Sequence, residues 1–128
     1  MRSFAVAAIL GSLVACGGGA REGLVLTQTS GPLTMAMHVA STIVGEPGPI
    51  RLVVMHGERP APGTAQIEWS MDGMPMTDRP KPLVRVSPGT YEQRASVFSM
   101  SGRWHARVAF REHDRDLAMT TFTIEVHD

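Results

Sequence analysis

The chain of 128 residues has little cysteine, no net charge and few aromatic side chains. A single cysteine excludes a disulfide within the chain. Because 12 basic residues balance 12 acidic ones, the composition predicts no basic patch and no nucleic-acid partner. The longest apolar run covers residues 4–14, far short of the roughly 20 residues that a membrane-spanning helix needs. A chain of this length and composition is expected to form a single domain with one core.

The N-terminal apolar run follows one positive charge, Arg2, and is typical of a signal peptide over residues 1–15. Its end, Leu13-Val14-Ala15-Cys16, resembles the lipobox of bacterial lipoproteins, in which the cysteine is acylated and becomes the first residue. The resemblance implies a lipid bilayer as partner, held through Cys16, with residues 16–23 as a flexible tether. Acylation would leave no thiol for a disulfide, a metal or a nucleophilic reaction. The glycine after the cysteine is similar to the sorting pattern of Gram-negative lipoproteins, and this resemblance implies the bacterial cell envelope, at the outer membrane facing the periplasm.

Apolar and polar side chains alternate through most of residues 24–128, as in antiparallel strands with one exposed face. Clusters of glycine and proline separate these segments. The pattern predicts an all-β fold, an immunoglobulin-like antiparallel β-sandwich of about seven strands. The expected strands lie near 33–40, 49–56, 65–71, 83–87, 90–98, 103–110 and 118–126. Residues 22–30 fit either an extra edge strand or part of the tether.

Aromatic side chains at inward positions of these strands form the expected core. They are Trp69, Trp104, Tyr91, Phe98, Phe110 and Phe122. Met35 and Met37 alternate with polar neighbours and are expected to fill the same interior, because methionine packs well into irregular cores.

Methionine is abundant, with nine residues, and three of them fall within residues 71–76, a segment that glycine and proline interrupt. Met71 continues the inward phase of its strand and is expected in the core. Met74 and Met76 lie beyond the strand, and Met100 lies in a predicted loop. Soft thioethers are ligands that Cu(I) prefers, so these three side chains are candidate copper ligands. Loop packing is the alternative for each of them.

If consecutive strands run antiparallel, the methionines at 71–76 and 100 share one end of the sandwich with His38 and His105. Imidazole beside thioether is a workable copper-binding set, and solvated histidines without a role are the alternative. Because the lipid anchor precedes the strand near 33–40, this end is expected to face away from the membrane.

Four short motifs occur in order along the domain: Gly57-x-x-Pro60-x-Pro62-Gly63, the Met71 to Met76 loop, Gly89-x-Tyr91, and Phe98-x-Met100-x-Gly102-x-Trp104. With them the chain resembles the YtkA-like domain, a small secreted β-sandwich often found in lipoproteins and related in pattern to FixH, an accessory of copper-containing oxidase assembly. The resemblance implies a sandwich fold and a link to copper. The methionine loop of that family often also holds a histidine, whereas Thr77 and Asp78 follow Met76 here.

The sequence offers no nucleophile-elbow context and no zinc-protease motif, so we do not expect an enzyme. The leading expectation is a non-catalytic, lipid-anchored envelope module that binds or passes copper through its methionine-rich loop. The alternative is an envelope protein interaction or accessory module with no metal role, because methionine also suits adaptable protein contacts.

Overall fold

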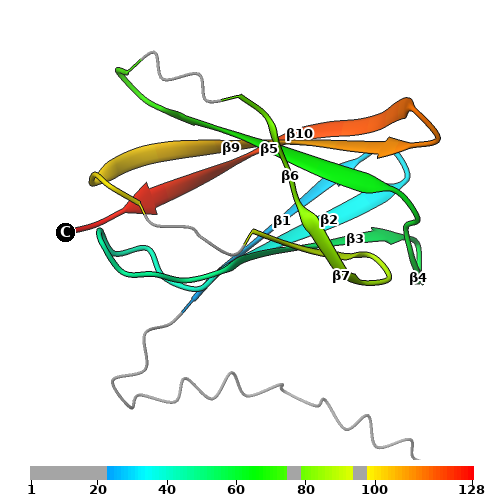
Figure 1. Ribbon diagram of the computed structural model, residues 1–128, viewed down its shortest axis with the longest axis horizontal. Coiled ribbons are helices and arrows are strands. Elements are labelled where there is room, and N and C mark those ends of the chain that lie inside the picture. The colour runs from blue at the N-terminus through cyan, green and yellow to red at the C-terminus, as the bar shows by residue number, and fades with distance from the viewer. Residues whose placement is uncertain (1–22, 75–78, 94–97) are drawn as a thin grey trace, which may run out of the picture.

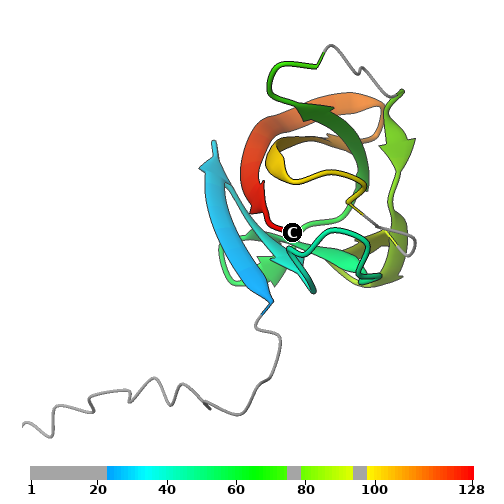
Figure 2. The same cartoon turned by 90° about the vertical axis from the view of Figure 1, so that its left-hand side faces the viewer.

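A computed structural model describes residues 23–74, 79–93 and 98–128. These residues form two antiparallel β-sheets packed face to face (Figures 1 and 2). No helix long and apolar enough to cross a membrane occurs in those ranges. The predicted signal peptide, Cys16, most of the tether and Met76 lie outside the described residues.

Ten strands make up the two sheets. The first sheet has the order β1 (Leu24–Ser30), β2 (Leu33–Val39), β3 (Ile50–His56), β8 (Thr90–Gln93) and β7 (Val84–Ser87), with β4 (Arg59–Pro60) paired to β3. The second sheet has the order β10 (Arg115–Val126), β9 (Gly102–Glu112), β5 (Thr64–Met71) and β6 (Lys81–Pro82).

The predicted immunoglobulin-like sandwich is confirmed by this strand order. If β2, β3, β5, β7, β8, β9 and β10 are named A to G, the sheets are ABED and CFG, the arrangement of a constant-type immunoglobulin domain. The long strands β9 and β10 extend beyond their predicted limits, because their hairpin continues to a turn at residues 113–114. β1, β4 and β6 add to the seven predicted strands.

Strand β1 settles the alternative left open for residues 22–30. It forms a hairpin with β2 in which Leu24 pairs with Val39 and Ser30 pairs with Leu33. The strand near 33–40 is therefore the second strand of the domain. The chain enters the domain at Gly23, at the end where β2 finishes.

The inward faces of both sheets supply the core, which includes Met35, Met37, Phe110 and Phe122, each without exposed surface. Tyr91 is buried with them, and its hydroxyl donates a hydrogen bond of 2.7 Å to the Gly63 carbonyl. Burial raises the pKa of Tyr91, and the charge of Arg85 acts in the opposite direction. The tyrosine thereby joins β8 to the loop before β5.

Glycine is required at position 63 by close packing. A Cβ atom there would lie 2.4 Å from the Arg111 carbonyl oxygen and 2.6 Å from the Phe110 ring. The Phe110 ring also meets Tyr91 edge to face, with ring centroids 6.0 Å apart. Gly63 and Tyr91, both members of the sequence motifs, thus serve one packing arrangement.

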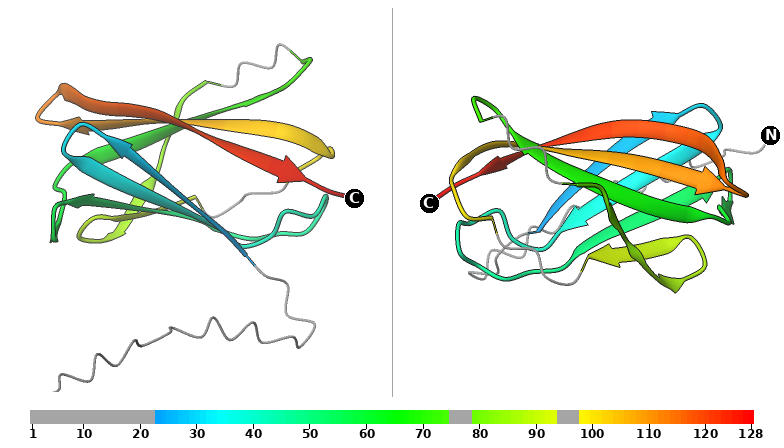
Figure 3. Two further views of the ribbon diagram at one scale, coloured as in Figure 1. Left: turned by 180° about the vertical axis from the view of Figure 1, so that it is seen from behind. Right: turned by 45° about the horizontal axis from the view of Figure 1, so that its top comes forward.

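The two open sides of the sandwich are closed differently. On one side the segment of β6 and β7 passes from the second sheet to the first, and between them the Leu83 amide donates to the Ala65 carbonyl at 2.9 Å. On the other side β1 lies against β10 (Figure 3), where the Gln28 side-chain amide donates to the Thr121 carbonyl at 3.5 Å.

Candidate functional site

One end of the sandwich collects the segments that carry Met71, Met74 and Met100, and we call it the methionine end (left in Figure 1). The loop of residues 40–49 reaches it, because Ile43 forms a bridge with His127 and the Gly45 amide donates to the Phe98 carbonyl at 3.0 Å. On the other sheet the Asp72 amide donates to the Arg103 carbonyl at 3.1 Å. The alternating strand directions therefore bring these segments together.

Two exposed methionines flank a pair of residues in the β5–β9 ladder, Met71 and Trp104. The Met74 amide donates to the Met71 carbonyl at 3.2 Å, and the Trp104 indole N–H donates to the Met100 carbonyl at 3.0 Å. Met74 is 39% exposed and Met100 is 42% exposed. Two accessible thioethers thus lie on segments that are both hydrogen-bonded to the Met71–Trp104 pair.

The expectation that Met71 lies in the core is wrong: this last residue of β5 is half-buried and is not part of the buried core. Its ε-methyl lies over Gly102, where an added Cβ atom would come within 2.5 Å of that methyl carbon. Gly102 also has a φ of 136°, which favours glycine. The glycine at the start of β9 therefore sets the position of Met71.

Aromatic rings support the methionine end from inside. The Trp69 indole donates to the Gln93 side chain at 3.0 Å and meets Phe98 edge to face, with centroids 5.6 Å apart. Phe98 in turn lies 5.5 Å from the Trp104 ring. Five of the six predicted core aromatics are buried, whereas Trp104 is partly buried and borders the surface.

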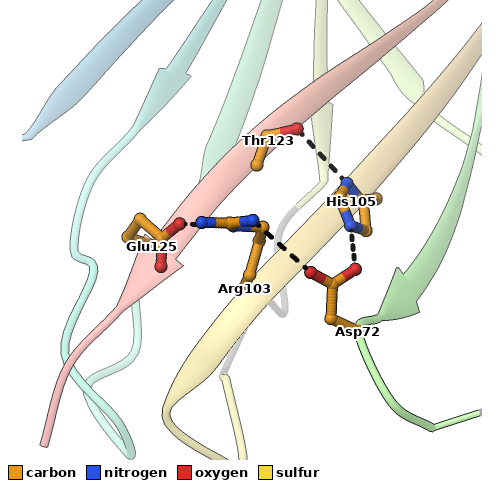
Figure 4. Close-up of polar contacts among 5 residues, drawn as sticks. All are labelled: Asp72, Arg103, His105, Thr123 and Glu125. Atoms are coloured by element: carbon orange, nitrogen blue, oxygen red, sulfur yellow. Dashed lines mark hydrogen bonds and ion pairs between the residues drawn. The ribbon is translucent and has the colours of Figure 1, made fainter.

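His105 lies on the outer face of the second sheet with both ring nitrogens engaged (Figure 4). Its Nε2 is 2.6 Å from Asp72 Oδ1, and its Nδ1 is 3.2 Å from Thr123 Oγ1. An ionised carboxylate can only accept, so Nε2–H donates to Asp72, and in the neutral ring Nδ1 accepts from the Thr123 hydroxyl. This histidine holds the Asp72 loop and has no free nitrogen for a metal.

Arg103 extends the same network. Its Nε is 2.7 Å from Glu125 Oε1, and its Nη1 is 3.7 Å from Asp72 Oδ2. The hydrogen bond and charge of Glu125, followed by the charge of Asp72, raise the pKa of Arg103. Asp72, Arg103, Thr123 and Glu125 were not among the residues predicted for the site. Two features of the sequence could have pointed to them. Arg103 and His105 are two residues apart and therefore share the outer face of their strand, and the acidic Asp72 lies between Met71 and Met74.

His38 lies on the outer face of the first sheet, exposed, with Val25 and Arg51 as its cross-strand neighbours. His38 and His105 therefore occupy the outer faces of different sheets and do not converge on the methionine sulfurs. Among the described residues, no group of three or more His, Cys, Asp or Glu side chains could hold a metal ion. Met74 and Met100, on two segments at this end, remain as exposed candidate ligands.

No family model, curated protein or solved structure matches this chain. The resemblance to the YtkA-like domain thus stays a prediction from the sequence motifs. In the structure those motifs have packing explanations at Gly63, Tyr91 and Gly102, and the methionines beside them are the part that packing does not fully account for.

Proposed function

We propose that this protein is a non-catalytic binding module of the cell envelope, anchored by lipid at Cys16, that binds or passes Cu(I) at its methionine end. The observation that carries the proposal is the exposure of Met74 and Met100 on segments bonded to the Met71–Trp104 pair. A thioether that only filled space would gain most from full burial, as Met35 and Met37 do. The resemblance to the YtkA-like domain supports the same metal.

The thioether donors at the methionine end favour Cu(I) over Cu(II). Thioether sulfur is a soft ligand that selects Cu(I), whereas Cu(II) prefers nitrogen and oxygen donors. His105 is engaged on both nitrogens, and His38 lies on a different face. Met74 and Met100 are accordingly the proposed ligands, with Met76 close by in sequence.

Strand β1 changes the expected orientation of this site. The expectation of a membrane-distal methionine end depended on the strand near 33–40 being the first one, and β1 precedes it. Since Leu24 pairs with Val39, the tether leaves the domain at the methionine end. We therefore place the proposed copper site on the anchor side of the domain.

Competitive titration tests the copper proposal. A Cys16→Ser chain is titrated with Cu(I) against a chromogenic chelator under reducing conditions, because an unacylated thiol would itself bind Cu(I). The variant Met74→Leu/Met100→Leu keeps the apolar volume and removes both sulfurs. We expect affinity to fall by at least about tenfold, equivalent to about 1.4 kcal/mol.

The matched control is Met119→Leu, which replaces an exposed thioether on the outer face of β10. This residue accepts hydrogen bonds from the Arg107 guanidinium and lies outside the proposed site. Its affinity should equal that of the parent. If the double variant also matches the parent, the copper role is rejected.

The alternative function, an envelope interaction module with no metal role, uses the same exposed methionines as adaptable protein contacts. Pull-down from solubilised membranes separates the two. Partner recovery that the double variant abolishes, and that neither copper nor a chelator alters, would favour this alternative.

A further inference from the structure

The outer face of the first sheet carries an open hollow of about 790 Å³. Its lining includes Gly23, Val25, His38, Arg51, Val53 and Val86. Two of these valines are strongly exposed, Val25 at 56% and Val86 at 43%. We call this surface the valine face. Nothing in the proposed copper site uses it.

The two outer faces differ sharply in charge. Among the described outward residues of β1, β2, β3 and β8, the formally charged ones are Arg51 and Glu92, and they pair with each other at 3.4 Å. The edge strand β7, which carries Val86, adds the exposed Arg85. The outer face of the second sheet and its adjoining loop carry many more charges: Glu68, Asp72, Arg103, Arg107, Arg111, Asp116 and Glu125. Covering the valine face removes few charges from water, so its desolvation is the less costly of the two.

The tether begins at the rim of this hollow. Gly23 and Val25 both line it, and Cys16 is seven residues before Gly23. A fully extended chain of that length spans at most about 25 Å. A lipid on Cys16 therefore holds Gly23, at the rim of the valine face, within this distance of the bilayer, and at such a high effective concentration a weak surface contact is enough.

We propose that the valine face rests on the bilayer that holds the anchor. Val25 and Val86 meet the boundary between headgroups and acyl chains, where apolar side chains gain from burial. Arg51 and His38 lie beside them, placed to meet lipid phosphates. This inference rests on the lipid anchor of the proposed function and is independent of the copper site.

Depth-dependent quenching tests the inference on the lipidated mature protein in vesicles of phosphatidylethanolamine and phosphatidylglycerol. With Cys16 acylated, an introduced cysteine is a unique labelling site. Thr27→Cys places a fluorophore on the valine face, beside Ala36 in the ladder. Thr121→Cys places the same label on the outer face of β10, opposite Arg107. Both threonines are exposed, so they form a matched pair.

Brominated lipids should quench the Thr27 label several-fold more strongly than the Thr121 label. A further Val25→Asp substitution should remove that difference while the protein still floats with the vesicles, because it puts a charge on the contact surface. Circular dichroism of the variant checks that the sandwich is intact.

Equal quenching at the two positions, in protein that floats with the vesicles, rejects the inference and leaves the anchor standing. Failure to float with the vesicles removes the anchor and this inference together. Excimer emission between pyrene labels at position 27, in place of quenching by lipid, would assign the valine face to a second copy of the chain and overturn the bilayer contact.

Discussion

The Nε2 atom of His105 lies 2.6 Å from Oδ1 of Asp72, and this contact ties the segment between Met71 and Met74 to the outer face of β9. Arg103 holds the other carboxylate oxygen at 3.7 Å. The Asp72 carboxylate is thus held by Arg103 and His105, which are neighbours on the same face of β9. The polar network of the second sheet and the methionine end are therefore parts of one structure.

A double-mutant cycle measures the strength of this link. Asp72→Ala, His105→Ala and the double variant are compared by urea unfolding. Because both side chains reach solvent, we expect a coupling free energy of about 0.5–1 kcal/mol. Simple additivity of the two single substitutions would show that the contact does not stabilise the fold.

Substitution of Gly102 should disturb the proposed copper site. Gly102→Ala destabilises the fold by about 1 kcal/mol through its positive φ, and it also forces the Met71 methyl group to move. Gly31→Ala, in the turn between β1 and β2 at the opposite end of the sandwich, is the matched control, since Gly31 also has a positive φ, 57°, but a Cβ atom there meets nothing within 4 Å. Cu(I) titration should show weaker binding for Gly102→Ala and unchanged binding for Gly31→Ala. The reverse order would contradict the placement of Met71 beside the site.

Core methionines should not contribute to copper affinity. Met37 has no exposed surface, so Met37→Ala should cost about 2–5 kcal/mol of unfolding free energy through the cavity that it leaves. Met37→Leu keeps the volume and should cost less than about 1.5 kcal/mol. Its Cu(I) affinity should equal that of the parent, and a loss of affinity would extend the site into the core.

Removing the Tyr91 hydroxyl tests the link between β8 and the loop before β5. Tyr91→Phe leaves the Gly63 carbonyl without its 2.7 Å donor and should cost about 1–3 kcal/mol, measured by urea unfolding. The Phe110 contact remains in place, so far-UV circular dichroism should not change. An unchanged unfolding free energy would mean that water replaces the hydroxyl at no cost.

The same tyrosine predicts a pH dependence. Burial raises the pKa of folded Tyr91 above its ordinary value of 10.0, so the folded state holds its proton more tightly than the unfolded state does. The contribution of this difference to the free energy of unfolding is fully present below pH 10.0. It is lost as the pH rises through the pKa of the folded state. Unfolding free energy should therefore fall less steeply between about pH 9 and 11 in Tyr91→Phe than in the parent. Parallel slopes would contradict this.

Much of the fold could be predicted from local pattern. The alternation of Leu33, Met35 and Met37 with polar neighbours located β2, and the same period located β3, β5, β9 and β10. Period two is a property of the strand itself, so neighbouring residues determine it. The buried positions of Trp69 and Phe110 followed from the same alternation, whereas that of Tyr91 followed from its resemblance to a residue that packs at a sandwich corner.

The candidate site was less predictable. The alternating direction of the strands placed Met74, Met100 and His105 at one end. It could not predict the hydrogen-bond partners of each side chain or the sheet face on which it lies. His105 is held by Asp72 and Thr123, which come from distant parts of the chain, and His38 faces the other side of the sandwich. Such partners depend on strand register and on sheet assignment, and neither is a local property.

The sequence by itself determined the strands, the inward residues and the concentration of thioethers at residues 71–100, because side-chain alternation and turn residues act over a few positions. Only the tertiary structure decided that β1 precedes β2. That strand moves the tether to the methionine end. The pairing of β5 with β9 places Met71 beside Trp104, and the assignment of β2 and β9 to different sheets separates the two histidines. The reason is physical: an edge strand is specified by its pairing with a neighbour and by the surface that this pairing buries, and both exist only in the assembled sheets.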